Sequence, residues 1–364
     1  MIDKTICFFT GFMAEGGAER VIAILGNYFV SNGWQVEIVT YYDDIYLYQI
    51  DERIKKVSVE KNTQSRNIVK NIMWIRRYFT EKQCVIISFL AIYNIMILVS
   101  LIGLHIPIVV ADRNDPNYVP NKKWLRLLRN ICYEYLADQV VLQTHHNKEY
   151  FSQKTQKKSS VIYNPINLGE NKGKALTTKK ENVIVAVGRL IKQKNYAMLM
   201  EAFHKIICTG EDYCLEIYGE GDERDYIEAF SKKNNLQGRV VLKGGKNDPI
   251  PLIGKAKLYV LTSKYEGMPN SLLEAMCLGI PVISTKVSGA TDLIIHGVNG
   301  YLVDDGDVDG LANYMKLIIN SDEIINRMGT EAAKVNEYVK LEKIAEQWEK
   351  LIIEVLNKNE NRCY

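Results

Sequence analysis

The segment YEGMPNSLLEAMCLGIP, residues 265–281, predicts a loop and a short helix at the end of a buried strand. The apolar run at residues 257–261 comes shortly before it and is typical of a strand inside a parallel sheet. Asn270 and Ser271 are good N-terminal caps, so we expect a helix over residues 271–278. The start of such a helix exposes free backbone N–H groups and the positive end of the helix dipole, which favours a bound phosphate.

Two carboxylates flank this helix start. Glu266 lies in the loop before it, and Glu274 lies about one turn inside the helix, on the side that faces back toward the loop. A carboxylate beside an anion site is a poor phosphate ligand, but it is a good hydrogen-bond acceptor for sugar hydroxyls. The segment therefore indicates a site for a nucleotide sugar. The alternative is a plain strand–loop–helix connection with two solvated glutamates, which are favoured near helix starts in any case.

The same segment resembles a known family. In EGMPNSLLE, seven residues separate Glu266 from Glu274, and this spacing is similar to the Glu-x7-Glu signature of the family 4 (group 1) retaining glycosyltransferases. VGRLIKQKNY at residues 187–196 and GGAERV at 16–21 resemble family motifs too, and they occur in the expected order. The resemblance implies an α/β protein of the GT-B fold, with two Rossmann-like, doubly wound parallel-sheet domains that face a cleft.

Length and composition agree with two domains. A chain of 364 residues with 47% hydrophobic and 24% charged residues can build two large cores. We expect an acceptor-binding domain at residues 1–168, a polar linker at 169–182 and a nucleotide-sugar-binding domain at 183–340. In the family the last helix, here about 341–364, crosses back onto the first domain, and we expect the same in this chain.

Other features indicate the compartment. The seven scattered cysteines include no Cys-x-x-Cys pair, which indicates free thiols in a reducing environment. Residues 85–110 form the longest apolar stretch, but polar residues, a glycine and a proline interrupt it, so it predicts strand, helix, strand rather than a membrane span. Since the chain begins with a short strand and a glycine loop, we expect no signal peptide and a cytoplasmic location.

The first 41 residues predict a βαβ unit with a glycine-rich turn. Strands at 5–10 and 34–41 flank a helix at 18–30, and Gly16 and Gly17 lie in the turn. The dinucleotide spacing G-x-G-x-x-G does not occur there, which disfavours a nicotinamide cofactor. The glycines provide a tight turn, a backbone that approaches a ligand closely, or both.

Two cations follow the first predicted strand of the second half. Arg189 and Lys194 would lie at the carboxyl edge of a parallel sheet, where a diphosphate would balance their charge. The alternative is a surface cation pair. The resemblance assigns both residues to the nucleotide diphosphate, Glu274 to the ribose hydroxyls and Glu266 to the donor sugar, and we take Glu266, Arg189 and Lys194 as the catalytic residues. The expected donor contacts are Gly16, Gly17, Gly188, Arg189, Lys194, Gly219, Lys243, Gly244, Glu266, Gly267, Met268, Pro269, Asn270, Ser271 and Glu274.

Basic residues gather in the first half of the chain. Residues 1–180 carry a formal charge of +8 and residues 181–364 one of −5, and this polarity suggests contact with an anionic surface. A predicted helix at 121–135 combines basic residues with Trp124 and Leu127, which suits the headgroup layer of a membrane. The alternative is a solvated basic face with both of these apolar side chains in the core.

Polar residues at the end of the predicted strand 106–111 indicate an acceptor site. Arg113 and Asn114 follow this strand, and we expect them to bind a phosphate of the acceptor. The alternative for Arg113 is a loop salt bridge with Asp112 or Asp115. Many family members carry a histidine in this loop, and its replacement here disfavours any histidine-based activation of the acceptor.

The resemblance implies sugar transfer from a nucleoside diphosphate with retention at the anomeric carbon. The segment SFLAIYNIMILVSLIGLHIPIVVADRNDP, residues 88–116, resembles the branch of the family that builds bacterial surface polysaccharides and lipid-linked oligosaccharides. We expect a UDP-sugar donor and a polyprenyl-diphosphate-linked acceptor at the inner face of the cell membrane, with no cofactor and no nucleic-acid partner. Since no Asp-x-Asp motif with supporting ligands lies near the site, we expect metal-independent activity.

Three other functions are compatible with parts of the sequence. A transferase of the same family could act on a glycerolipid or a soluble acceptor. A sugar-nucleotide-binding protein without catalysis is disfavoured by the intact Arg189, Lys194, Glu266 and Glu274. A nucleotide-sugar epimerase of the same fold usually needs other acids and histidines and lacks the seven-residue spacing.

Overall fold

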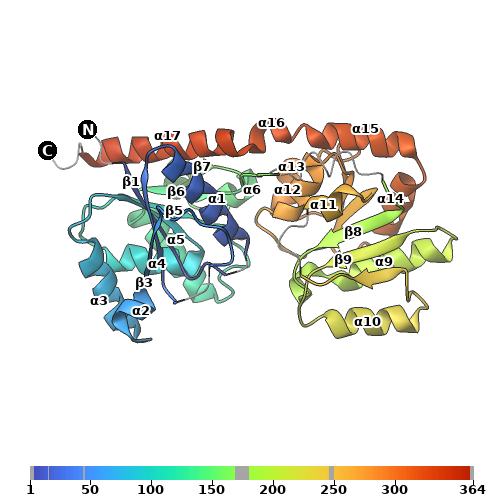
Figure 1. Ribbon diagram of the computed structural model, residues 1–364, viewed down its shortest axis with the longest axis horizontal. Coiled ribbons are helices and arrows are strands. Elements are labelled where there is room, and N and C mark those ends of the chain that lie inside the picture. The colour runs from blue at the N-terminus through green and yellow to red at the C-terminus, as the bar shows by residue number, and fades with distance from the viewer. Residues whose placement is uncertain (1–3, 15, 44–45, 169–179, 246–249, 361–364) are drawn as a thin grey trace. The chain divides into compact units, whose positions relative to one another are not determined.

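The computed structural model describes residues 4–14, 16–43, 46–168, 180–245 and 250–360 (Figure 1). The chain divides into two units, Met1–Pro165 with Val339–Tyr364, and Ile166–Tyr338. Each unit is built around one parallel β-sheet with helices, as predicted. The predicted linker lies largely at residues 169–179, outside the described residues.

The first unit contains a seven-stranded sheet in the order β3-β2-β1-β4-β5-β6-β7, in which all neighbouring strands are parallel. The strand order reverses between β1 and β4, which is the doubly wound pattern. The strands are β1 (Thr5–Thr10), β2 (Gln35–Thr40), β3 (Lys55–Ser58), β4 (Val85–Phe89), β5 (Ile108–Ala111), β6 (Gln139–Leu142) and β7 (Ser159–Val161). The helices are α1 (Gly17–Ser31), α2 (Val59–Thr63), α3 (Ile68–Phe79), α4 (Ala91–Ser100), α5 (Lys123–Tyr135), α6 (His145–Glu149), α7 (Gln153–Lys157) and α17 (Leu341–Glu360).

Helices cover both faces of this sheet. Strand β1 is buried on both sides, so Ile6 and Phe8 enter one core while Cys7 and Phe9 enter the other. The first core is closed by α1 and α17, whose Trp348 is fully buried. The second core is closed by α3, α4 and α5. The C-terminal helix α17 is thus part of the core of the first unit.

The second unit contains a six-stranded parallel sheet in the order β10-β9-β8-β11-β12-β13. Its strands are β8 (Val183–Val187), β9 (Cys214–Tyr218), β10 (Val240–Leu242), β11 (Leu258–Leu261), β12 (Val282–Thr285) and β13 (Tyr301–Val303). Its helices are the 3-10 helix η1 (Lys192–Lys194), α9 (Tyr196–Cys208), α10 (Arg224–Lys233), α11 (Ile250–Gly254), α12 (Asn270–Cys277), α13 (Ser288–Leu293), α14 (Val308–Ile319), α15 (Asp322–Ala333) and α16 (Asn336–Val339).

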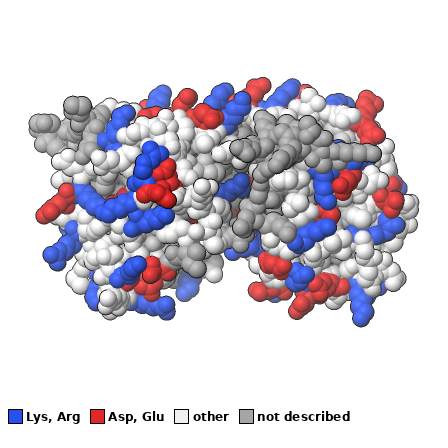
Figure 2. All heavy atoms as spheres, viewed as in Figure 1, with Lys and Arg blue, Asp and Glu red and all other residues white. Residues whose placement is uncertain are grey.

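The surface of the second unit is acidic around α10. Figure 2 shows acidic side chains at the lower edge of this unit, where α10 lies. Glu220 and Glu228 each pair with Arg224 at 3.0 Å. This local excess of carboxylates is part of the negative charge of the second half of the chain.

Three sequence predictions differ from the structure. The short edge strand β3 was not predicted, because its first two residues are exposed and it lacks a long apolar run. Helix α12 begins at Asn270, and Pro269 in the N-cap position makes no side-chain capping bond, so Asn270 and Ser271 are not the caps that we expected. Trp124 and Leu127 are 61% and 63% exposed, so the alternative that placed them in the core is wrong.

The long apolar stretch forms β4, α4 and β5, as predicted. Among the helices of the described residues, none combines the length and the apolar character needed to cross a membrane. Four of the six described cysteines are buried thiols, whereas Cys208 is exposed and Cys214 lies between these extremes.

Candidate active site

Glycines line the carboxyl edge of the second sheet. Gly188, Gly219 and Gly244 follow the ends of β8, β9 and β10. The Gly188 N–H donates to the Tyr218 carbonyl at 2.9 Å, and the Gly219 N–H donates to the Gly244 carbonyl at 3.0 Å. A Cβ atom on Gly219 would lie 1.9 Å from the Gly188 carbonyl oxygen, so only glycine allows these turns to pack together.

Lys194 and Glu266 meet at this edge. The Lys194 Nζ atom lies 2.7 Å from Glu266 Oε1, and about one-seventh of each side chain is exposed. Two further hydrogen bonds hold the two loops together: Gln193 Nε2 donates to the Tyr265 carbonyl at 2.8 Å, and Thr262 Oγ1 donates to the Lys194 carbonyl at 2.9 Å. The cation and the carboxylate that the sequence predicted for the donor site are therefore in direct contact.

The start of α12 is fastened to the end of β8. Ser271 Oγ lies 2.7 Å from the Tyr259 hydroxyl and donates to the Val187 carbonyl at 3.3 Å. Burial raises the pKa of Tyr259, so its hydroxyl stays protonated. Because the Ser271 hydroxyl bonds to groups of the sheet, it does not cap the helix, and the prediction of Ser271 as a cap is wrong for this reason. As in any α-helix, the first N–H groups point out of the helix start and do not take part in the hydrogen bonds between successive turns.

Glu274 lies inside α12 and is 1% exposed. A carboxylate this deeply buried needs hydrogen-bond partners or a bound polar group.

Lys243, also predicted to contact the donor, forms an ion pair elsewhere in the second unit. Its Nζ atom lies 3.1 Å from Glu216 Oε1, and Lys255 Nζ lies 3.1 Å from the same oxygen atom. Burial opposes ionisation of Glu216, but hydrogen bonds from Tyr218, Lys255 and Lys243 outweigh it and lower the pKa of this carboxyl.

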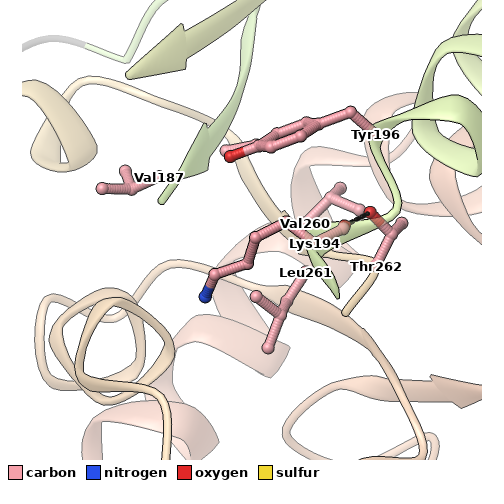
Figure 3. A pocket seen from close by; sticks show the side chains of 7 residues that line it. Val187, Lys194, Tyr196, Val260, Leu261 and Thr262 are labelled. Atoms are coloured by element: carbon pink, nitrogen blue, oxygen red, sulfur yellow. Dashed lines mark hydrogen bonds between the residues drawn. The ribbon is translucent and has the colours of Figure 1, made fainter. Parts of the chain in front are cut away.

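Two residues of this site were missed by the sequence interpretation. The Tyr196 hydroxyl donates to the Gly188 carbonyl at 2.8 Å, and burial, with the nearby Glu266 charge, raises the pKa of Tyr196. A small pocket lies between Tyr196, Lys194 and the end of β11 (Figure 3). Figure 3 shows the ends of the Tyr196 and Lys194 side chains directed to the same side, where Val187 also lies.

Gly289, in α13, is the second missed residue. A Cβ atom there would lie 2.5 Å from the Gly267 carbonyl oxygen and 2.7 Å from the Met268 Cα atom. The loop before α12 therefore rests directly on this glycine. Arg189, which the sequence predicted for the diphosphate, follows Gly188 at the carboxyl edge of the second sheet, and it is exposed.

The remaining predicted residues belong to the first unit. Gly16 is the N-cap of α1 and Gly17 its first residue, and the Tyr48 hydroxyl donates to the Gly16 carbonyl at 2.8 Å. Arg113 and Asn114 follow β5. Asn114 is partly exposed, and its carbonyl oxygen accepts a hydrogen bond from Asn147 at 3.3 Å.

Arg113 is buried and donates through Nη1 to Asn164 Oδ1 at 3.0 Å. Its guanidinium carbon lies 4.8 Å from the ring centre of Phe89 and 5.7 Å from that of Trp348. Burial lowers the pKa of Arg113 to about 9, and among the described residues its Nε and Nη2 atoms have no hydrogen-bond partner. Its neighbour Asp112 pairs with Arg129 at 3.5 Å.

The described residues contain no cluster of three or more His, Cys, Asp and Glu side chains that could hold a metal ion.

Two family models match consecutive parts of the chain. Residues 15–170 match the model described as Glycosyltransferase Family 4, and residues 169–335 match Glycosyl transferases group 1. The chain belongs to the group 1 glycosyltransferases. Together the two matches cover residues 15–335 of this glycosyltransferase, and the second of them includes the Glu266–Glu274 segment.

Curated relatives of this glycosyltransferase include two enzymes from Campylobacter jejuni. One, named GalNAc-alpha-(1->4)-GalNAc-alpha-(1->3)-diNAcBac-PP-undecaprenol alpha-1,4-N-acetyl-D-galactosaminyltransferase, is 28% identical over 97% of this chain and 99% of its own. The other, an N-acetylgalactosamine-N,N'-diacetylbacillosaminyl-diphospho-undecaprenol 4-alpha-N-acetylgalactosaminyltransferase, is 30% identical over 60% of this chain and 59% of its own.

Solved structures show the same fold. TarM of Staphylococcus aureus, in a complex that contains UDP, superposes with a TM-score of 0.80 at 15% identity over 96% of this chain and 99% of its own. HepE of Anabaena in complex with UDP superposes with a TM-score of 0.78 at 18% identity over 96% of this chain and 100% of its own. The two parallel-sheet units of this glycosyltransferase thus form the GT-B fold.

Proposed function

We propose that this enzyme transfers a hexose or N-acetylhexosamine from a UDP-sugar, with retention, to a polyprenyl-diphosphate-linked saccharide at the cytoplasmic membrane face during bacterial glycan assembly. The observation that carries the proposal is the contact of Lys194 with Glu266 beside the start of α12. The undecaprenol-linked saccharides in the names of the two Campylobacter relatives support the acceptor class, and the UDP complexes of TarM and HepE support the donor.

In this proposal the donor binds along the glycine edge of the second sheet. The diphosphate lies against Arg189, Lys194 and the N–H groups at the start of α12, which stabilise the negative charge of the leaving group. Glu274 accepts hydrogen bonds from the ribose and Glu266 from the sugar. Lys243 and Gly244 lie toward the base.

Arg113 and Asn114 are proposed to bind the acceptor diphosphate. The Arg113 guanidinium is buried, and two of its nitrogen atoms lack hydrogen-bond partners among the described residues. A buried cation with unused hydrogen-bond donors favours the binding of an anion. The loop contributes no histidine, so the activation of the acceptor hydroxyl relies on other groups.

Thermal shift with nucleotides tests the donor assignment. UDP at about one hundred times its dissociation constant is expected to stabilise the protein by about 2.7 kcal/mol and to raise its Tm by several degrees. GDP and ADP serve as matched controls, with smaller expected shifts. If no nucleoside diphosphate changes the Tm, the donor site is wrongly assigned.

Removal of divalent metal is expected to leave activity within about twofold, because Arg189, Lys194 and a helix start supply the positive charge that the leaving diphosphate needs. The measurement is the transfer rate before and after treatment with EDTA. Loss of the rate, with recovery on adding Mn²⁺, would show that the cations of the protein are insufficient.

A further inference from the structure

The outer face of helix α5 is apolar. Residues at helical spacing point away from the core and are 61%, 63%, 47% and 65% exposed: Trp124, Leu127, Ile131 and Tyr135. The opposite side of α5 enters the core through Cys132 and Tyr133. A helix with apolar residues on both sides leaves one side for a partner.

The neighbouring helices also expose apolar residues. Helix α4 packs against α5 on one side and α3 on the other, so the three form one layer of the first unit (Figure 1). The exposed apolar residues of this layer, here called the α3–α5 surface, are Ile68, Val69, Met73, Ile92, Val99, Ile102, Trp124, Leu127, Ile131 and Tyr135. Single exposed apolar residues are ordinary, but many of them on neighbouring helices of one layer are typical of an interaction surface.

The charges on this layer are predominantly positive. Helix α4 has no charged residue, and the sequences of α3 and α5 contain six Lys and Arg residues and a single acid, Glu134. Arg129 is buried and Arg76 donates to carbonyls at the end of α4, but Lys70, Arg77 and Lys123 are exposed around the apolar residues. Lys122, just before α5, adds a further exposed cation.

A second copy of the chain is a poor partner for this surface. A symmetric dimer places the same patch of both copies face to face, so cations would oppose cations with almost no carboxylate to balance them. Anionic lipid headgroups balance these charges, and the acyl boundary accepts Trp, Tyr, Leu and Ile side chains. Charge and apolar character together select a lipid bilayer.

We propose that the α3–α5 surface docks on an anionic lipid bilayer, with the α5 side chains at the boundary between headgroups and acyl chains. This inference rests on the proposed function, in which the lipid-linked acceptor lies in that membrane. Arg129 of α5 donates to the carbonyls of Val119 at 2.7 Å and Pro116 at 3.2 Å. The docked helix is thereby fastened to the loop that carries Arg113 and Asn114.

Cosedimentation of the full chain with vesicles tests the docking surface. Vesicles with one-third phosphatidylglycerol are expected to pellet the wild type, and the double variant Trp124→Ser with Leu127→Ser is expected to bind at least about tenfold more weakly. Ile295→Ser is the matched control, because Ile295 is 64% exposed in the second unit, and its binding is expected to equal that of the wild type. Lys122→Glu with Lys123→Glu is expected to weaken binding about tenfold or more, and vesicles of phosphatidylcholine alone are expected to bind the wild type weakly.

Each contrary result has a definite meaning. Equal pelleting of the wild type and the Trp124/Leu127 variant would overturn the proposal, as would a lipid-free dimer, seen by sedimentation velocity, that this variant abolishes. Unchanged UDP binding and an unchanged Tm in this variant would show that the substitutions act on docking alone. Failure of the proposed function would instead appear as lost UDP binding or transfer in a wild type that still pellets, so the two failures are distinguishable.

Discussion

Replacement of Lys194 by alanine is expected to lower kcat/KM for the donor by about 100- to 1,000-fold, the usual cost of removing one group that stabilises transition-state charge. The Lys194 ammonium lies 2.7 Å from Glu266 and is only 15% exposed, so in the proposed donor site its charge would act on the leaving diphosphate in partly desolvated surroundings. The variant also leaves the Glu266 carboxylate without this cation, which weakens diphosphate binding further. Steady-state kinetics with a UDP-sugar and titration with UDP measure both effects.

Lys192→Ala is the matched control for this prediction. Lys192 begins the same 3-10 helix, but it is exposed, so its loss is expected to change kcat/KM by less than about threefold. Equal losses in the two variants would indicate a general electrostatic effect rather than a specific contact. Unchanged kinetics in Lys194→Ala would remove this residue from the catalytic set.

The sheets were predictable because their strands are buried on both faces. Such strands are continuous apolar runs bounded by glycines and polar residues, and the predicted limits of β1 agree with the structure to the residue. Strand β3 was not predictable in this way, because it lies at the edge of the sheet and exposes two lysines. Helix α5 shows a second limit: its apolar residues occupy two faces, and periodicity alone does not say which of them meets the core.

The site was predictable only in part. The spacing in the sequence indicated Lys194, Glu266 and Glu274, and the structure brings Lys194 and Glu266 into contact. The partners that hold the site in place could not be predicted, because they come from distant segments. Tyr259 of β11 forms a hydrogen bond with Ser271 of α12, and no local sequence pattern indicates this bond. Gly289 supports a loop that lies about twenty residues earlier, and in the sequence it resembles any other glycine at a helix start.

Replacement of Gly289 by alanine is expected to displace the loop before α12. The new methyl group would lie 2.5 Å from the Gly267 carbonyl oxygen and 2.8 Å from Pro269 Cδ, which are distances that a folded chain does not tolerate. Relief of this overlap is expected to cost about 1–3 kcal/mol of unfolding free energy, as other overpacked cores do. The shift is also expected to weaken UDP binding by about tenfold or more, since hydrogen bonds to phosphate depend steeply on the position of the backbone N–H groups. Urea unfolding and calorimetric titration with UDP measure the two effects.

Gly245→Ala separates this local effect from a general loss of glycine. Among the described residues, a Cβ atom on Gly245 would meet only Glu220 Cγ at 4.0 Å, so we expect stability and UDP affinity close to those of the wild type, although Gly245 also lies near the carboxyl edge of the second sheet. The proposed phosphate site requires that stability and affinity fall together in Gly289→Ala, because the loop that must move is the one that presents the N–H groups. A variant that loses stability but binds UDP as before would place the phosphate away from the start of α12.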